Sequence, residues 1–166
     1  ESKSTFKRAL KDMQIGDVVS ASSLAGDFVL PEDAKKKLVF IAGGIGITPF
    51  RSMVQYLMDT KDARPVTLLY SNKTASEIAY KSIFDAATQT IGMKTVYALT
   101  AEPNPVPGTY AGKIDSTLIA REIPDYKDRT FYISGPHGMV TAFEKILHNM
   151  GVSRFRIKTD YFPGFA

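Results

Sequence analysis

Short apolar runs alternate with amphipathic stretches along the chain from residue 38 onward. Residues 38–42 form a continuous apolar run, which is typical of a strand that is covered on both faces in a parallel sheet. After the glycines that follow, apolar side chains recur every three or four residues up to Met58, and this period predicts one buried face of a helix. Further strands are expected in the segments with a similar β-like composition: 66–70, 93–99, 130–133 and 154–160.

Helices are expected between these strands. They are predicted at 76–87, 115–121 and 138–150. Ser76 is a suitable N-cap for the first of them, and Gly151 ends the last. Strands and helices in this order predict an α/β fold with three layers around a parallel five-stranded sheet, Rossmann-like, in strand order 3-2-1-4-5. The segment 101–112 holds three prolines and two glycines, so we expect a loop there, and long loops in compact domains are often functional.

The first 36 residues have a different character. They contain a turn signal at Gly16, alternating residues after it, and a short apolar stretch that ends at Pro31. This pattern predicts a small β remnant that cannot fold alone. We therefore divide the chain into this remnant at 1–36 and a complete domain at 37–166. Because the chain starts at Glu1 rather than Met, we expect it to be part of a longer polypeptide.

Composition narrows the possible functions. The chain of 166 residues has no cysteine, which excludes a disulfide framework, a thiolate zinc site and a cysteine-ligated iron–sulfur cluster built from this chain. His137 and His148 stand without metal-ligand spacing, so no metal site is expected. The net charge of +4 is scattered rather than gathered in a basic aromatic stripe, so nucleic-acid binding is not expected. No apolar run reaches the ~18 residues of a membrane span, so we expect a cytoplasmic protein, or one held at the cytoplasmic face of a membrane by an upstream anchor.

Two glycine turns carry the candidate chemistry. Gly43, Gly44 and Gly46 stand between the first strand and its helix, where backbone amides and the helix N-terminus suit a phosphate group. Pro49 fits the first helical turn, because its missing N–H would have no intrahelical partner there. The segment 134–139 has the same placement after the fourth strand. Since ligands of open α/β sheets bind beyond the carboxyl ends of the strands, the two turns predict a dinucleotide site.

The residues of these turns resemble those of a known family. The segment Ala42-Gly43-Gly44-Ile45-Gly46-Ile47-Thr48-Pro49 resembles the dinucleotide loop of the ferredoxin–NADP reductase superfamily. Ser134-Gly135-Pro136, with Met139, resembles its second nicotinamide motif, in which a cysteine usually stands in place of the serine. The resemblance extends through residues 68–74 and covers essentially the whole chain. It implies an NAD(P)-binding domain preceded by a truncated FAD-binding domain.

This resemblance implies a set of cofactor-binding residues. Those on the pyrophosphate and nicotinamide side are Gly43, Gly44, Gly46 and Thr48, and the two turns are completed by Ile47, Pro49, Gly135, Pro136 and Met139. Those near the adenosine half are Ser71, Asn72, Lys73 and Tyr80. Ser134 takes the catalytic position beside the nicotinamide, where a hydroxyl can position the ring, and Thr100 lines the nicotinamide ribose.

Both ends of the chain resemble flavin-contacting parts of the family. Thr5 lies in a segment like the end of the flavin-binding barrel, where small hydroxyl residues contact the flavin phosphates. The aromatic tail implies that Phe162 and Phe165 pack near the flavin ring, or else that they only close the hydrophobic core. The arginine–tyrosine–serine strand that holds the flavin ring in the family is absent. This fragment is therefore expected to bind FAD poorly and to be inactive alone.

The function implied is that of a flavin-dependent NAD(P)H oxidoreductase. The domain would set the nicotinamide of NAD(P)H against FAD for hydride transfer, and electrons would leave to an iron–sulfur, haem or other acceptor. The expected partners are the missing upstream flavin domain and that acceptor. An alternative is a nucleotide-binding or partner-docking module without turnover, because a fold alone does not set function. The choice of cofactor stays open: Glu77 could bond a ribose hydroxyl of NAD, whereas Lys73 and Ser71 could hold the 2′-phosphate of NADP.

Overall fold

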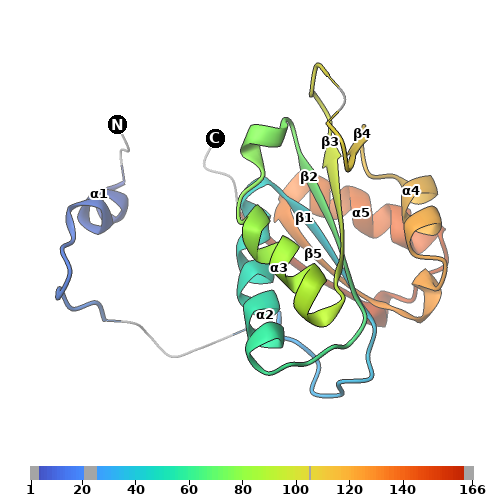
Figure 1. Cartoon of the computed structure of the whole chain (residues 1–166), viewed down its shortest axis with the longest axis horizontal. Helices are drawn as coiled ribbons and strands as arrows, with labels where there is room; N and C mark the ends of the chain where they lie inside the picture. The colour runs from blue at the N-terminus through green and yellow to red at the C-terminus, as the bar shows by residue number, and fades with distance from the viewer. Residues whose placement is uncertain (1–3, 21–25, 105, 163–166) are drawn as a thin grey trace.

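The computed structural model describes residues 4–20, 26–104 and 106–162, with only the backbone of Phe162. From residue 38 on, helices cover both faces of a single sheet (Figure 1). The strands are β1 Leu38–Gly43, β2 Val66–Asn72, β3 Lys94–Leu99, β4 Thr109–Ala111, β5 Thr130–Pro136 and β6 Ile157–Phe162. The α-helices are α1 Thr5–Asp12, α2 Ile47–Asp59, α3 Lys81–Ile91, α4 Ser116–Glu122 and α5 His137–Asn149. The short 3₁₀ turns are η1 Gly44–Gly46, η2 Ala75–Glu77, η3 Tyr126–Asp128 and η4 Arg154–Arg156.

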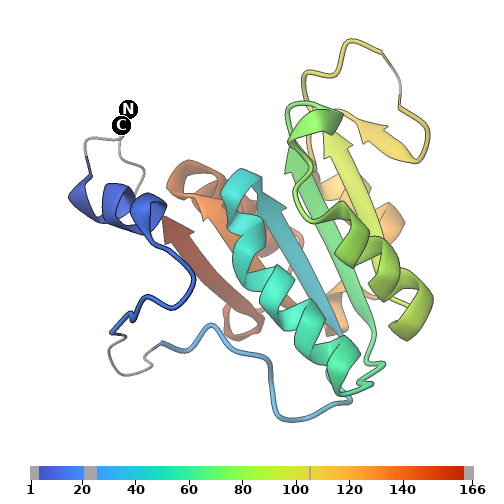
Figure 2. The same cartoon turned by 60° about the vertical axis from the view of Figure 1, so that its left-hand side comes forward.

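The described strands form one parallel sheet in the order β4-β3-β2-β1-β5-β6 (Figure 2). The α/β class, the parallel pairing and the order of the five expected strands are confirmed, because 3-2-1-4-5 corresponds to β3-β2-β1-β5-β6. The prediction of five strands is wrong, since β4 adds a sixth inside the segment expected to be a loop. A turn at Gly108, whose φ is +78°, leads the chain back alongside the end of β3.

The central strand β1 explains how one apolar run serves two cores. All six of its residues are buried, and alternate side chains point to opposite faces of the sheet. On one face, Phe40 stacks on Phe50 of α2 with 4.7 Å between ring centroids, and α3 covers the same core. On the other face, Val39 and Ile41 pack with residues of α4 and α5. Because all strands are parallel, their carboxyl ends share one end of the body, the carboxyl end, and their amino ends share the opposite one, the amino end.

Residues 26–36, which we call the strap, pack on this body without forming a strand. The Phe28 ring lies 5.8 Å from the Phe50 ring and 5.2 Å from the Tyr132 ring, measured between centroids. The Tyr132 hydroxyl donates a hydrogen bond of 2.8 Å to the Val29 carbonyl. Burial raises the pKa of the Tyr132 hydroxyl, so it keeps its proton for this bond. The strap therefore closes the α2 face of the core.

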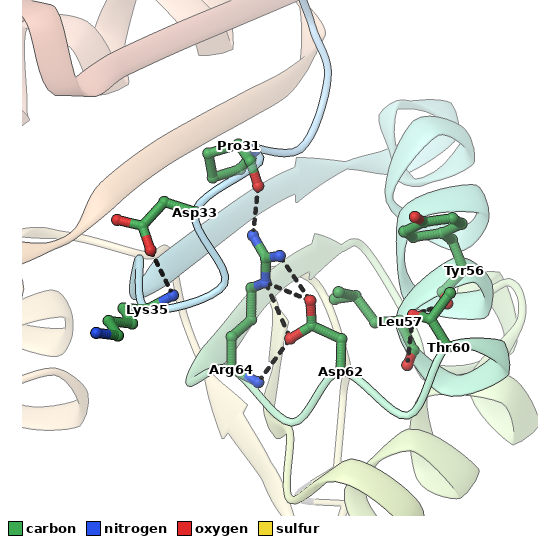
Figure 3. A network of polar contacts seen from close by, with 8 residues as sticks. All are labelled: Pro31, Asp33, Lys35, Tyr56, Leu57, Thr60, Asp62 and Arg64. Atoms are coloured by element: carbon green, nitrogen blue, oxygen red, sulfur yellow. Dashed lines mark hydrogen bonds and ion pairs between the residues drawn. The ribbon is translucent and has the colours of Figure 1, made fainter.

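A buried ion pair fastens the strap further along. The Arg64 side chain is 5% exposed, and its guanidinium donates to the Pro31 carbonyl at 2.8 Å (Figure 3). Three further hydrogen bonds of 2.6–3.1 Å run from this side chain to the Asp62 carboxylate. Hydrogen bonding from Arg64 lowers the pKa of Asp62 in spite of its partial burial. The pair holds the strap against the loop between α2 and β2.

The N-terminal segment departs from the prediction of a β remnant. Residues 4–20 and the strap contain no strand, and α1 is the regular element they hold. Ser4 caps α1 by accepting a hydrogen bond from the Lys7 amide at 3.3 Å. Every residue of 4–20 except Met13 is exposed, and Figure 1 draws α1 apart from the α/β body. A strand needs a partner strand, and the described residues offer none here. No helix among the described residues has the length and apolar character needed to cross a membrane.

The helix expected at 76–87 begins five residues later. Ser76 does not cap it, because Ser76 lies in η2 and its hydroxyl pairs with that of Thr74 at 2.9 Å. The chain then passes through Tyr80, whose φ of +57° is in the left-handed region, and α3 starts at Lys81. The residues between β2 and α3 are thereby freed to line the carboxyl end of the sheet.

Candidate functional site

The two glycine turns meet at the carboxyl end of the sheet. A methyl group added to Gly46 would overlap the backbone of Ser134 and Gly135, so only glycine fits where the turns cross. A methyl group added to Gly43 would likewise overlap the Met139 sulfur, whose side chain fills the space between the turns. The predicted pairing of these turns is therefore a packed contact, with β1 and β5 as neighbouring strands beneath it.

The first turn lies at the start of α2. Gly44 has a φ of +52°, a left-handed conformation that glycine adopts without strain. The Tyr70 hydroxyl fixes the turn from below by donating to the Gly44 carbonyl at 3.2 Å, and the Thr48 hydroxyl donates to the Ile45 carbonyl. Gly46 is the N-cap of α2 and has no side chain to accept from the first helical amides. The Ile47 amide is bonded to the Gly44 carbonyl within the turn, and Pro49 has no N–H, so the start of α2 offers an anion mainly the positive end of the helix dipole.

Beside this turn lies a cavity of about 390 Å³. It is lined by Gly44, Ile45, Ile47, Thr48, Tyr70, Asn72, Glu77, Ala79 and Tyr80. The Asn72 side chain is 5% exposed, and neither its nitrogen nor its oxygen has a hydrogen-bond partner among the described residues. It comes near the Tyr70 hydroxyl without a well-formed hydrogen bond, and burial raises the pKa of that hydroxyl. A buried amide without partners costs free energy unless a ligand completes it.

Two carboxylates shape the loop that follows β2. The Glu77 carboxylate accepts a hydrogen bond of 3.1 Å from the Lys73 amide, which fixes one wall of the cavity. The Glu102 carboxylate accepts from the Ala75 amide at 2.7 Å. Thr100 donates to the Asn72 carbonyl through its amide at 3.0 Å and through its hydroxyl at 3.3 Å. The loop after β3 therefore holds the loop after β2 in place.

Ser134 is placed as expected at the carboxyl end of β5, but its side chain is covered. It is 0% exposed, and its hydroxyl has no hydrogen-bond partner among the described residues. In the sheet it stands beside Ala42 of β1 and Asp160 of β6. A hydroxyl in this state has an unused donor and acceptor directly under the crossing of the two turns.

The structure brings together most residues predicted for the site. Those that line the cavity are Gly44, Ile47, Thr48, Asn72, Glu77 and Tyr80. Those at the crossing of the turns are Gly43, Gly46, Ser134, Gly135 and Met139. Ser71 of β2 pairs with Gly43 of β1 in the sheet, and Thr100 is hydrogen-bonded to the Asn72 carbonyl. The Lys73 side chain is exposed and does not line the cavity.

Other predicted residues lie elsewhere. Pro49 lines a second cavity, between α2 and the strap. Thr5 is exposed at the start of α1. The backbone of Phe162 pairs with Pro136 at the end of β6, and Phe165 lies outside the described residues. No group of histidine, aspartate and glutamate side chains in the described part of the chain is arranged to hold a metal ion.

Sequence reasoning missed three residues that build the site. Tyr70 stands two residues before the predicted Asn72 on β2, so both side chains point to one face, and a polar tip near the carboxyl end of a buried strand was the available signal. Glu102 contacts the site from a loop 27 residues away, and no local pattern indicates that contact. Ala79 lines the cavity with backbone and a methyl group, which leave no sequence signal.

Comparisons with known proteins agree with this geometry. The sequence model of the oxidoreductase NAD-binding domain family matches residues 40–145. The flavohemoprotein of Oceanobacillus iheyensis is 29% identical over 151 residues, which are 90% of this chain and 37% of that protein. The chain thus spans well under half the length of this curated relative.

Two solved structures share the fold. The FAD/NAD-binding domain of nitric oxide dioxygenase from Vibrio cholerae has a TM-score of 0.74 at 25% identity, with 83% of this chain and 55% of that chain covered. The ferredoxin-NADP⁺ reductase of Plasmodium falciparum has a TM-score of 0.68 at 20% identity, with 92% and 63% covered, which shows the fold alone. With its motifs, fold and family match in agreement, the chain belongs to the oxidoreductase NAD-binding domain family of the ferredoxin–NADP reductase superfamily.

Proposed function

We propose that this chain binds a reduced nicotinamide dinucleotide at the carboxyl end of its sheet and presents it to a flavin held by a domain that precedes it. The observation that carries the proposal is the Asn72 amide, which is buried, lines the cavity beside the glycine turn and has no hydrogen-bond partner among the described residues. Its donor and acceptor together match a ribose hydroxyl or an adenine edge. A bound nicotinamide would supply a hydride, while the chain supplies orientation and excludes water.

The pyrophosphate would bind at the start of α2. Its charge suits the positive end of the 13-residue helix α2. The exposed Ile45 side chain would cover it from the solvent side. The nicotinamide would extend toward the crossing of the two turns, where the Ser134 hydroxyl would position the ring after a small opening of its cover.

For the adenosine ribose we propose a preference for NADH over NADPH. Glu77 is the charged side chain that lines the cavity, and the Lys73 amide holds its carboxylate there. A carboxylate accepts hydrogen bonds from the ribose hydroxyls of NADH and repels the 2′-phosphate of NADPH. The exposed Lys73 does not line the cavity, so it does not neutralise this repulsion.

The N-terminal residues support a flavin domain as the missing partner. This short segment exposes several apolar side chains, which is unusual: they are Phe6, Leu10, Ile15 and Val18, each at least 47% exposed. We propose that residues 1–36 are the end of that domain, that these side chains complete its core, and that Thr5 at the start of α1 lies near the flavin phosphates. FAD would then be held mainly by residues outside this chain, and electrons would pass to a haem or iron–sulfur acceptor.

The proposal is tested by calorimetric titration of the purified chain with NADH and NADPH. We expect NADH to bind more tightly than NADPH. Glu77→Gln should make the two affinities more similar, because it weakens the repulsion of the 2′-phosphate of NADPH. Ile45→Glu places a carboxylate at the pyrophosphate position without disturbing the core, and should weaken binding about tenfold, whereas Ile45→Gln should not. If the chain binds neither nucleotide at millimolar concentration, even after the upstream domain is restored, it is a docking module and the proposal is wrong.

A further inference from the structure

Basic residues collect at the amino end of three neighbouring strands. Residues 35–37 precede β1, residues 127 and 129 precede β5, and residues 154 and 156 precede β6, and each of these seven positions holds lysine or arginine. The three strands are adjacent and parallel in the order β1-β5-β6, so these positions lie side by side at one end of the sheet. That end is opposite the glycine turns (Figure 2).

Hydrogen bonds join these segments into one strip. The Thr130 amide donates to the Lys37 carbonyl at 2.9 Å, which holds the approaches to β1 and β5 together. The Arg156 guanidinium donates to the Lys127 carbonyl at 3.1 Å, which joins the approach to β6. We call residues 32–37, 125–129 and 154–156 the amino-end strip.

The strip carries most of the chain's excess positive charge. It holds seven cationic and four acidic side chains, a surplus of three, compared with a net charge of +4 for the whole chain. Asp125 is shared between Lys37 at 2.8 Å and Arg129 at 2.7 Å. Within the described residues, Lys36, Lys127 and Arg154 form no ion pair. The structure therefore uses part of this charge and leaves the remainder facing solvent.

An exposed aromatic ring lies within the strip. Phe155 is 82% exposed, and the Arg154 guanidinium lies 5.0 Å from its ring centroid. A cavity of about 480 Å³ adjoins it, lined by Glu144, Lys145, His148, Asn149, Arg154 and Ile157. Arginine and aromatic side chains are the types that contribute most at protein interfaces, and the cavity offers room for a side chain beside them.

We propose that the amino-end strip and this cavity form a docking surface for an acidic polypeptide segment. Carboxylates would meet Lys36, Lys127 and Arg154, and an apolar side chain would cover Phe155. The strip also contains Asp128 and other acidic residues, which a uniformly negative lipid surface or nucleic acid backbone would repel but which a polypeptide with both charges would accommodate. Because the strip lies at the opposite end of the strands from the glycine turns, the chain could hold the partner and the nucleotide at the same time.

The test uses the purified chain and a fluorescent peptide that is rich in glutamate and aspartate but also contains a few lysines and one central leucine, at low ionic strength. Lys127→Glu/Arg154→Glu should weaken peptide binding roughly tenfold. The matched control is Arg51→Glu/Lys113→Glu, which changes the charge equally at two exposed residues elsewhere and should leave the affinity within about twofold. Phe155→Ser should also weaken binding several-fold without any change of charge.

Three results would overturn the inference. If both charge-reversed variants lose the same amount of peptide affinity, the binding depends on the net charge of the chain and not on the strip. If the wild-type chain does not bind the peptide, the strip is not a docking surface. If the chain binds phosphatidylserine vesicles or RNA more strongly than the peptide, its partner is not an acidic polypeptide. NADH titration of every variant separates this inference from the proposed function, because loss of peptide binding with intact NADH binding concerns the strip alone.

Discussion

The two ends of the sheet differ in whether their main buried polar groups have hydrogen-bond partners. At the carboxyl end, the Asn72 amide and the Ser134 hydroxyl are buried and have no partner in the described chain. At the amino end, Asp125 bonds two cations and the buried Arg64 bonds both Asp62 and the strap, and the exception among the described residues is the Thr95 hydroxyl near the start of β3, which is buried without a partner. Unsatisfied buried groups destabilise a fold, and satisfied ones do not. The difference indicates that the amino end maintains the fold while the carboxyl end is arranged for a ligand.

The comparison predicts opposite mutational behaviour. Substitutions that remove the hydrogen-bonded polar groups at the amino end should destabilise the chain and leave nucleotide binding intact. Substitutions that remove them at the carboxyl end should stabilise the ligand-free chain and weaken nucleotide binding. Stability and affinity must both be measured for each variant, since either alone would not distinguish the two ends.

The largest effect is expected at Arg64. Arg64→Met removes the ion pair and the bond to the strap and leaves Asp62 half-buried without its partner, which should lower the free energy of unfolding by about 3 kcal/mol. Urea unfolding measures the loss, and NADH affinity of the folded fraction should not change. The matched control is Lys81→Met, whose ion pair to Asp85 is about half exposed and should contribute under ~0.5 kcal/mol. Equal effects in the two variants would contradict a special role for the buried pair.

At the carboxyl end, Asn72→Leu should act in the opposite direction. Leucine has a similar size and no unsatisfied amide, so the free energy of unfolding of the ligand-free chain should rise by about 1 kcal/mol. NADH affinity should fall roughly tenfold, because the ligand loses a hydrogen-bonding group. Calorimetry and urea unfolding measure the two quantities. A variant that is both less stable and fully able to bind NADH would show that Asn72 is an ordinary core residue.

Ser134→Ala should give a smaller version of the same result. Removing the unpartnered hydroxyl should raise stability by about 0.5 kcal/mol and weaken NADH binding a few-fold. Thr95 provides the control, because its hydroxyl is also buried without a partner but lies near the start of β3, away from the glycine turns. Thr95→Val should therefore stabilise the chain equally and leave NADH binding unchanged. Loss of NADH binding in Thr95→Val would undo the distinction between the two ends.

The smallest expected effect concerns acid stability at the amino end. Burial raises the pKa of Asp125, but hydrogen bonds and charges from Lys37 and Arg129 outweigh it and lower this pKa from 3.8 to about 2. A carboxyl group whose pKa is lower in the folded state stabilises the fold above pH ~4, and this contribution is lost as the pH falls toward ~2. Asp125→Asn should flatten the stability profile in that window. An unchanged slope would show that the two cations do not favour the ionised carboxylate.

Much of the fold follows from local patterns in the sequence. The run at 38–42 is apolar at every position, so a central strand with two covered faces was predictable. The glycine turns were predictable because they stand directly between a strand and a helix. β4 was not predictable, since three residues after a proline-rich segment carry no hydrophobic period. The start of α3 was missed because Tyr80 takes a left-handed conformation that its residue type does not indicate.

The site was predictable in its position but not in its chemistry. The family resemblance placed Asn72 and Ser134 in the site, but only the structure shows that both are buried and have no hydrogen-bond partner among the described residues. The bond from Ala75 to Glu102 joins two loops that are distant in sequence, and such tertiary contacts leave no local signal. The covered state of Ser134 depends on Gly46 packing against its backbone, which again is a long-range contact.

The central claim is that nucleotide binds at the carboxyl end, and amide chemical shifts measured by NMR during NADH titration test it most directly. Our account predicts shift changes concentrated in residues 43–48, 71–80 and 134–139, with those at 125–129 and 154–156 unchanged. The Asn72 side-chain amide should show one of the largest changes, since it gains a hydrogen-bond partner in the ligand. Changes centred on the amino end, or the absence of any change at Asn72 under saturating NADH, would contradict the account.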